Sequence, residues 1–167
     1  MSNLLDDLRG SVPRKKNKKR ALPGQSEYDV QKKVVAWLQT NHPSIKFKCD
    51  FLAGAKLPIG LAVKAKKLGN TRAWPDLFVA LPKMPVKPTD KLLCGLFLEL
   101  NKEGETVFKK DGSIVANPHF REQHEMLRHL RGVGYEADFA VGFEETIKKI
   151  QNYVESRELN SEPLSPG

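Results

Sequence analysis

Two acidic residues stand beside the two most apolar segments of the sequence. Asp76 opens the segment DLFVAL, and Glu99 is the last but one residue of LLCGLFLEL. A carboxylate at the end of an apolar strand is costly unless it is paired or bound to a metal ion. If the two segments are neighbouring strands, the side chains can converge, and two such oxygen donors suit Mg²⁺ or Mn²⁺. The pattern therefore predicts a divalent-metal site that could bind a phosphate.

Each acidic residue, taken alone, also fits an ordinary structural role. Asp76 after a proline is typical of a turn, and Glu99 is compatible with a surface charge at a strand end. Glu27, in the first turn of the first expected helix, could simply complement the helix dipole. Gln123 falls on the apolar stripe of a later helix, where a hydrogen bond to the backbone would satisfy it.

Hydrophobic spacing divides the chain into helices and strands that would position these residues. Apolar residues three or four apart indicate helices, and alternation or a short apolar run indicates strands. Ser26 with Asp29 resembles a capping box at the start of the first helix. In chain order we expect a helix over 26–42, a strand over 44–51, a short helix over 61–69, strands over 76–81 and 92–100, a helix over 118–131, a strand over 135–141 and a helix over 142–154. This order predicts an α/β fold, a central mixed β-sheet flanked by α-helices.

One folded domain is expected over residues 25–155, because a chain of 167 residues normally forms a single domain. Residues 1–24 combine charge, proline and glycine without lasting periodicity, so we expect a basic, disordered N-terminal arm. Residues 156–167 are polar and contain two prolines, so we expect a disordered C-terminal tail.

Positive charge is concentrated in two places. The formal net charge is +8, and six of the positive residues form the run RKKNKKR at 14–20, so the remainder is nearly neutral. This arm would make salt-sensitive, sequence-independent contacts with nucleic-acid phosphates; a solvated tail that serves solubility explains it equally well. A second basic cluster precedes Trp74, and it is either a phosphate-binding surface or a solvated helix face. The candidate residues are Lys15, Lys16, Lys18 and Lys19 in the arm and Lys64, Lys66, Lys67 and Arg72 in the second cluster.

Two classes of protein are disfavoured by the sequence. The longest apolar runs fall well short of the ~20 residues that cross a membrane, and the start MSNLLDDLRG lacks the basic and apolar parts of a signal peptide. We therefore expect a cytoplasmic protein without a membrane partner. Cys49 and Cys94 show no CxxC or Cys/His spacing, so neither a disulfide nor a zinc site is expected.

The motifs, taken together and in order, resemble the PD-(D/E)XK nuclease superfamily. More narrowly, they resemble the virus-type replication–repair nuclease (VRR-NUC) domain, especially its small stand-alone phage versions. The resemblance covers about residues 26–154, through the stretches SEYDVQKKVVAWL, KKLGNTRAWPDLFVALP, GLFLELNKEG, KKDGSIVANPHFREQHEML and LRGVGYEADFAVGFEETIKKIQNY. It implies a restriction-endonuclease-like core.

The resemblance also implies roles for particular residues. Asp76 and Glu99 match the two metal-binding carboxylates of the family, and the backbone carbonyl of Leu100 matches a further metal donor. Glu27 matches a helix glutamate that helps to bind the metal or orients its water. Gln123 matches a glutamine on the helix after the central strands.

Position 101 departs from the family pattern, which has a lysine where this sequence has Asn101. A lysine there would stabilise the charge on the attacked phosphate or orient the attacking water, whereas asparagine carries no charge. Lys102 should point to the opposite face of the strand, and Lys109 or Lys110 could reach the site from the following loop. Three explanations stay open: an engineered inactivating change, a natural loss that leaves a DNA-binding pseudonuclease, or activity that persists without the lysine.

The function implied by the resemblance is metal-dependent, structure-selective cleavage of DNA, on branched substrates such as Holliday junctions. It also implies a homodimer, and a phage-encoded protein in a bacterial host cell. The alternatives are a non-catalytic DNA-binding module with the same fold and a protein that binds a host factor.

Overall fold

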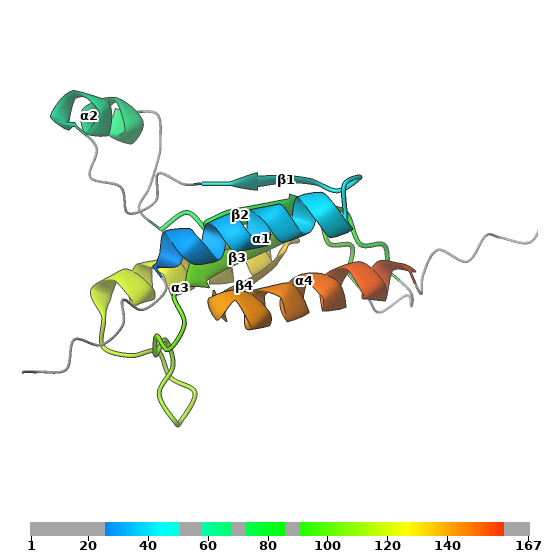
Figure 1. Ribbon diagram of the computed structural model, residues 1–167. Coiled ribbons are helices and arrows are strands. Elements are labelled where there is room, and N and C mark those ends of the chain that lie inside the picture. The colour runs from blue at the N-terminus through cyan, green and yellow to red at the C-terminus, as the bar shows by residue number, and fades with distance from the viewer. Residues whose placement is uncertain (1–25, 51–57, 68–72, 86–90, 159–167) are drawn as a thin grey trace, which may run out of the picture.

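The computed structural model describes residues 26–50, 58–67, 73–85 and 91–158. The arm expected over 1–24 and most of the expected C-terminal tail lie outside these residues. Figure 1 shows the described elements, a sheet with helices against both of its faces. They are α1 (Glu27–Asn41), β1 (Lys46–Cys49), α2 (Ile59–Lys67), β2 (Leu77–Ala80), β3 (Leu96–Asn101), α3 (Pro118–Gly132), β4 (Glu136–Val141) and α4 (Gly142–Glu158).

The sheet is mixed, as expected, and its register brings the two candidate carboxylates together. The strand order is β1-β2-β3-β4, with antiparallel pairing of β1 with β2 and of β2 with β3, and parallel pairing of β3 with β4. Leu77 of β2 lies opposite Leu98 of β3. One further step in this register places Asp76 opposite Glu99.

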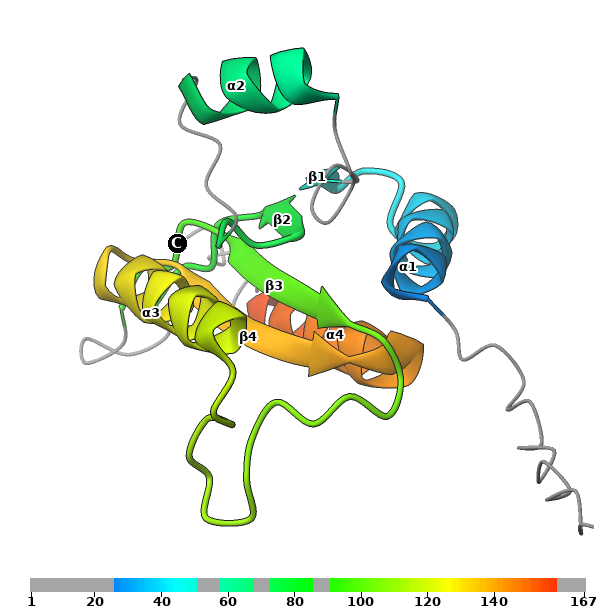
Figure 2. The same ribbon diagram turned by 90° about the vertical axis from the view of Figure 1, so that its left-hand side faces the viewer.

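Two hydrophobic cores cover the two faces of the sheet. Leu96, Leu98 and Leu100 of β3 pack against α1 and α4 on one face, whereas Phe97 packs toward α3 on the other. Figure 2 shows α3 on the side of the sheet away from α1 and α4. Because strand side chains alternate between faces, Glu99 and position 101 share the α3 face.

Local capping fixes the two helices that contribute to the candidate site. The Ser26 side chain accepts a hydrogen bond from the backbone N–H of Asp29, and the Asp29 carboxylate accepts one from the backbone N–H of Ser26. The predicted capping box is therefore confirmed, and it places Glu27 in the first helical turn. Asn117 caps α3 and Pro118 takes its first position, where a missing N–H costs nothing.

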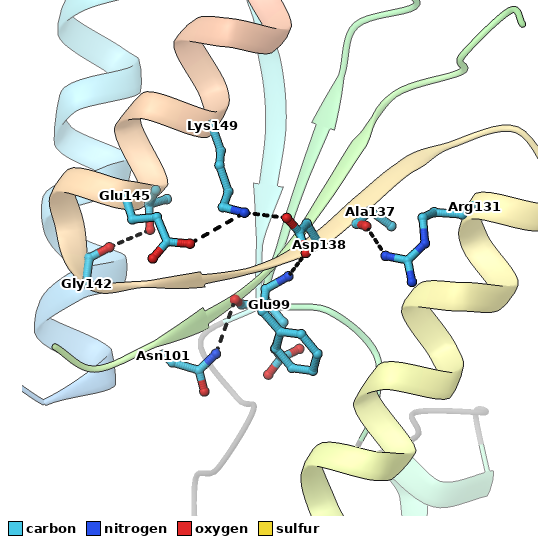
Figure 3. A network of polar contacts seen from close by, with 10 residues as sticks. Glu99, Asn101, Arg131, Ala137, Asp138, Gly142, Glu145 and Lys149 are labelled. Atoms are coloured by element: carbon cyan, nitrogen blue, oxygen red, sulfur yellow. Dashed lines mark hydrogen bonds and ion pairs between the residues drawn. The ribbon is translucent and has the colours of Figure 1, made fainter. Parts of the chain in front are cut away.

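The edge strand β4 is tied to the helices on both sides (Figure 3). Asp138 pairs with Lys149 of α4, which also lies 3.4 Å from Glu145. On the other side, the Arg131 guanidinium of α3 donates to the Ala137 carbonyl at 2.6 Å. These contacts hold β4 between α3 and α4.

Several element boundaries differ from the sequence expectation. The strand expected over 92–100 begins at Leu96, because β2 supplies no ladder partner before the Val79–Leu96 pair; the preceding residues make one isolated bridge, between Leu93 and Lys83. α4 continues to Glu158 although its apolar stripe ends at Val154, since no proline or glycine stops it there. β1 is shorter than 44–51, and α2 begins two residues earlier than expected.

α2 stands away from the sheet in both views (Figures 1 and 2). Its Ile59, Leu61 and Val63 are exposed. Within the described ranges, no helix is long and apolar enough to span a lipid bilayer.

Gly95 is required by a close approach between β3 and β2. A Cβ atom built at this position would lie 2.8 Å from the carbonyl oxygen of Val79 and 2.7 Å from Cε2 of Phe78. We expect Gly95→Ala to lower the free energy of unfolding by about 1–3 kcal/mol in urea denaturation. Gly132→Ala is the matched control, because a Cβ at Gly132 meets nothing within 4 Å. Equal stability of the two variants would contradict this packing.

Candidate metal centre

Three carboxylates from three different elements converge at one end of the sheet. Glu27 comes from the first turn of α1, Asp76 from the residue before β2, and Glu99 from β3. One oxygen of each lies within 4.8 Å of the others. Asp76 and Glu99 are buried, with exposed fractions of 1% and 4%, whereas Glu27 is exposed. The structure thus brings together the three acidic residues singled out in the sequence.

Asp76 is held by hydrogen bonds from two neighbouring elements. The backbone N–H of Leu100 donates to its Oδ2 at 2.8 Å, and Gln31 of α1 donates through Nε2 to its Oδ1 at 3.1 Å. Gln31 was not among the predicted site residues. Its only sequence signal is its place beside the apolar stripe of α1, which includes Val30 and Val34.

Glu99 is held from the opposite side of the sheet. The buried Gln123 of α3 donates through Nε2 to Glu99 Oε1, and the same nitrogen lies 3.0 Å from Nε2 of His119. Gln123 therefore reaches the site, as the family pattern implied. His119 of α3 is a further neighbour of the site, and it was not among the predicted site residues.

Burial strongly disfavours the charged forms of the carboxyl groups. Desolvation raises the pKa of Asp76, against the opposing hydrogen bond from Leu100, and Glu27 raises it further. Desolvation raises the pKa of Glu99 as well, and the nearby Asp76 adds to that shift. Desolvation and then Glu105 raise the pKa of Glu27, while Lys102 opposes them. Burial and repulsion between like charges therefore dominate the pKa values of these carboxyl groups.

The donor set fits a divalent cation that prefers oxygen ligands. Among the described residues, no lysine or arginine forms an ion pair with Asp76, Glu99 or Glu27. A buried carboxylate pair without such a partner is well matched to a small hard cation. The C=O of Leu100 lies on the same side of its strand as the N–H that binds Asp76. The carbonyl oxygen is therefore available as a further metal ligand.

Position 101 brings no charge to the cluster. Asn101 is buried on the Glu99 face of β3, and its Nδ2 lies 3.5 Å from the Glu99 carbonyl oxygen (Figure 3). Lys102, just beyond the strand, lies 3.5 Å from Glu105, and its charge acts on Glu27. It was expected on the face opposite Asn101. That face is covered by α1, which is how Lys102 comes near Glu27.

The other basic candidates either take no part in these contacts or have side chains outside the described residues. Lys109 lies in a hairpin that turns at Gly112, and both Lys109 and Lys110 are exposed. Lys64 and Lys67 are exposed on α2. The remaining candidates, whose side chains lie outside the described part, are Lys15, Lys16, Lys18, Lys19, Lys66 and Arg72.

Comparisons with known proteins bear on this fold. No protein-family model matches the chain, and no curated protein matches it. Among solved structures, the chain is similar to a protein described as a "VRR_NUC domain protein". The two share 25% sequence identity with a TM-score of 0.55, over 80% of this chain and 92% of that chain. This similarity supports a VRR-NUC domain in the chain. The VRR-NUC assignment confirms the expected restriction-endonuclease-like α/β core and gives the chain a nuclease-like fold.

A divalent metal should stabilise this VRR-NUC domain more strongly as the pH rises. With raised pKa values, the stabilising contribution of Asp76 and Glu99 to the metal-free protein is present at low pH and is lost as the pH rises through their folded-state pKa values. A cation bound to the ionised carboxylates offsets that loss. We expect the increase in melting temperature on replacing EDTA by Mn²⁺ to be larger at about pH 8 than at about pH 5.5.

Glu99→Gln is the matched variant for this measurement. An amide keeps an acceptor for Gln123 and offers a donor to Asp76, so the hydrogen bonds survive while one charge is removed. Without metal at about pH 8, we expect the variant to be more stable than the unmodified protein by at least about 1 kcal/mol, since one pKa unit corresponds to about 1.4 kcal/mol. The increase in its melting temperature on replacing EDTA by Mn²⁺ should be small. Equal gains in the two proteins would exclude Glu99 as a ligand.

Proposed function

We propose that this VRR-NUC domain is a metal-dependent DNA endonuclease that hydrolyses phosphodiester bonds, with branched DNA as its preferred substrate. The observation that carries the proposal is the carboxylate cluster of Glu27, Asp76 and Glu99. Two of its members are buried, and among the described residues none has a basic ion-pair partner. A nuclease-like fold with this donor set is suited to phosphate chemistry.

Each residue of the site has a proposed role. Asp76, Glu99, Glu27 and the Leu100 carbonyl would hold Mg²⁺ or Mn²⁺. Such a cation neutralises charge on a phosphate and makes a hydroxide nucleophile available near neutral pH. Leu100 N–H and Gln31 fix the Asp76 carboxylate, and Gln123 fixes that of Glu99. Restrained ligands lose little freedom when the cation binds, which favours binding.

A different residue supplies positive charge at the rim of the proposed site. Asn101 can offer a hydrogen bond to a water or a phosphate but not a charge. Lys102 is exposed, its charge acts on Glu27, and its ion pair with Glu105 at 3.5 Å is loose enough to exchange for a phosphate. We assign to Lys102 part of the electrostatic role that lysine has at position 101 of the family pattern.

DNA binding would add contacts away from the cluster. Lys64 and Lys67 are exposed on α2, the segment that leads toward Asp76, and can contact the phosphate backbone. The basic run at 14–20 would add non-specific affinity. Such contacts position the DNA but carry no sequence information.

The proposal extends to assembly and biological setting. The resemblance to small stand-alone phage domains supports a homodimer that acts on junctions, in DNA repair or replication within a bacterial cytoplasm. A second copy could cover the exposed apolar side chains of α2, which are Ile59, Leu61 and Val63. Light scattering on the full chain tests the dimer directly.

Asn101 favours a second candidate function, a DNA-binding pseudonuclease. Without a charged group at this position, the carboxylates could hold a cation that only anchors DNA. The two functions share the metal site and differ in turnover.

Cleavage assays with a four-way junction and a linear duplex in Mn²⁺ separate these functions. We expect junction cleavage by the unmodified protein, a loss of at least about 100-fold in Glu99→Gln, and a gain of about tenfold or more in Asn101→Lys. Gln39→Ala, on the exposed side of α1, is the control and should match the unmodified protein.

The pattern of activity decides the interpretation. Cleavage by Asn101→Lys alone would identify a disabled nuclease. Tight DNA binding without cleavage in any form would reject the enzyme and support the pseudonuclease. Absence of DNA binding at low salt would reject both, in favour of a protein that binds a host factor.

The basic arm should determine much of the salt dependence of DNA binding. We expect replacement of its central lysines by glutamine to reduce the slope of log affinity against log salt by up to about 0.9 per lysine that contacts duplex phosphate. The replaced residues are Lys15, Lys16, Lys18 and Lys19. The control replaces Lys91 and Lys148, exposed lysines to which no DNA contact is assigned, and should leave the slope unchanged. A quadruple variant with the unmodified slope would show that the arm does not touch DNA.

A further inference from the structure

The hydrogen bonds around Gln123 determine which nitrogen of His119 carries a proton. Gln123 Nε2 faces both Glu99 Oε1 and His119 Nε2, the latter at 3.0 Å. A carboxylate that holds a cation can only accept hydrogen bonds, so the amide must turn its NH₂ group toward Glu99. An NH₂ group has only donors to offer. His119 Nε2 must therefore be the acceptor, and its proton resides on Nδ1.

The other end of the Gln123 amide bears a cost of this orientation. Gln123 Oε1 is buried and has no hydrogen-bond partner in the described part of the chain. Leaving a buried oxygen unsatisfied is unfavourable. The reversed amide would be worse, because it would set that oxygen directly against the Glu99 carboxylate. Glu99 thus imposes the amide orientation, and the amide imposes the tautomer of His119.

His119 is an exposed residue beside the carboxylate cluster, and Nδ1–H is its remaining donor. It occupies the first turn of α3, where its backbone N–H donates to Asn117 Oδ1, and its ring lies nearly parallel to that of Phe120 at 6.4 Å between centroids. The residue is exposed, and Nδ1 is the ring nitrogen that does not face Gln123. A neutral imidazole with an oriented N–H is suited to bind a phosphate oxygen.

We propose that His119 is a substrate-contacting residue whose Nδ1–H, oriented through Gln123 by Glu99, donates to a phosphate oxygen of DNA next to the bond that is cut. The inference rests on the proposed function, since it needs DNA at the carboxylate cluster. It adds a contact from α3, on the face of the sheet opposite α1 and Lys102. DNA phosphates would then be held from both sides of the site.

Two conservative variants separate this role from a merely structural one. In His119→Asn the amide nitrogen can replace Nδ1 but the contact with Gln123 is lost. In His119→Gln the amide oxygen can replace Nε2 as the acceptor for Gln123, but the outward donor is lost. A residue that only supports Gln123 would tolerate glutamine better than asparagine. A residue that contacts phosphate would tolerate asparagine better than glutamine.

The measurement is the affinity for a four-way junction in Ca²⁺ and the cleavage rate in Mn²⁺, with the Ca²⁺-induced shift in melting temperature as a check on the metal site. We expect His119→Gln to bind the junction about tenfold more weakly, the effect of losing one charge-assisted hydrogen bond, and to keep the full Ca²⁺ shift. His119→Asn should retain most of the junction affinity. The reverse ranking, or a His119→Gln variant equal to the unmodified protein, would overturn the proposal.

An independent readout does not depend on activity. Long-range ¹H–¹⁵N NMR correlations of the Ca²⁺-loaded protein should show His119 as the Nδ1–H tautomer, and Gln123→Leu should release it toward the alternative form. An Nε2–H tautomer in the unmodified protein would overturn the inference even if DNA is cleaved. Failure of the unmodified protein to bind DNA, with the expected tautomer present, would instead reject the proposed function and the phosphate contact with it.

Discussion

The main constraint on this structure is the burial of two carboxylates, Asp76 and Glu99, whose oxygens lie close enough together to bind one metal ion. Such a pair is unfavourable while charged, and hydrogen bonds from neighbouring elements only partly offset that cost. Leu100 and Gln31 hold Asp76, and Gln123 holds Glu99. The donors come from α1, β3 and α3, so the cluster exists only when both faces of the sheet are covered.

The distribution of positive charge complements this constraint. No described cation pairs with the buried carboxylates, and Lys102 stays at the rim with Glu105. A lysine at position 101 would neutralise part of the buried charge permanently. Asn101 leaves the cluster more dependent on a bound cation, which ties occupancy of the site closely to the stability of the domain.

Much of the site could be predicted from the sequence because its acidic residues occupy recognisable places: after a proline, near the end of an apolar strand and in a capped first turn. Their convergence required the β2–β3 register, which depends on pairing between distant segments. Gln31 and His119 carried no comparable signal, since a polar residue beside an apolar stripe is common in helices. The start of β3 was set too early because its apolar run extends beyond the partner that β2 provides.

The edge strand β4 limits how the molecule can associate. Its outward Ala137 carbonyl already accepts from Arg131, and the Phe139 N–H already donates to the Asp138 carboxylate. A strand from another chain would have to displace both bonds to continue the sheet on this side. Any symmetric pair of these molecules is therefore expected to join through surfaces other than this edge.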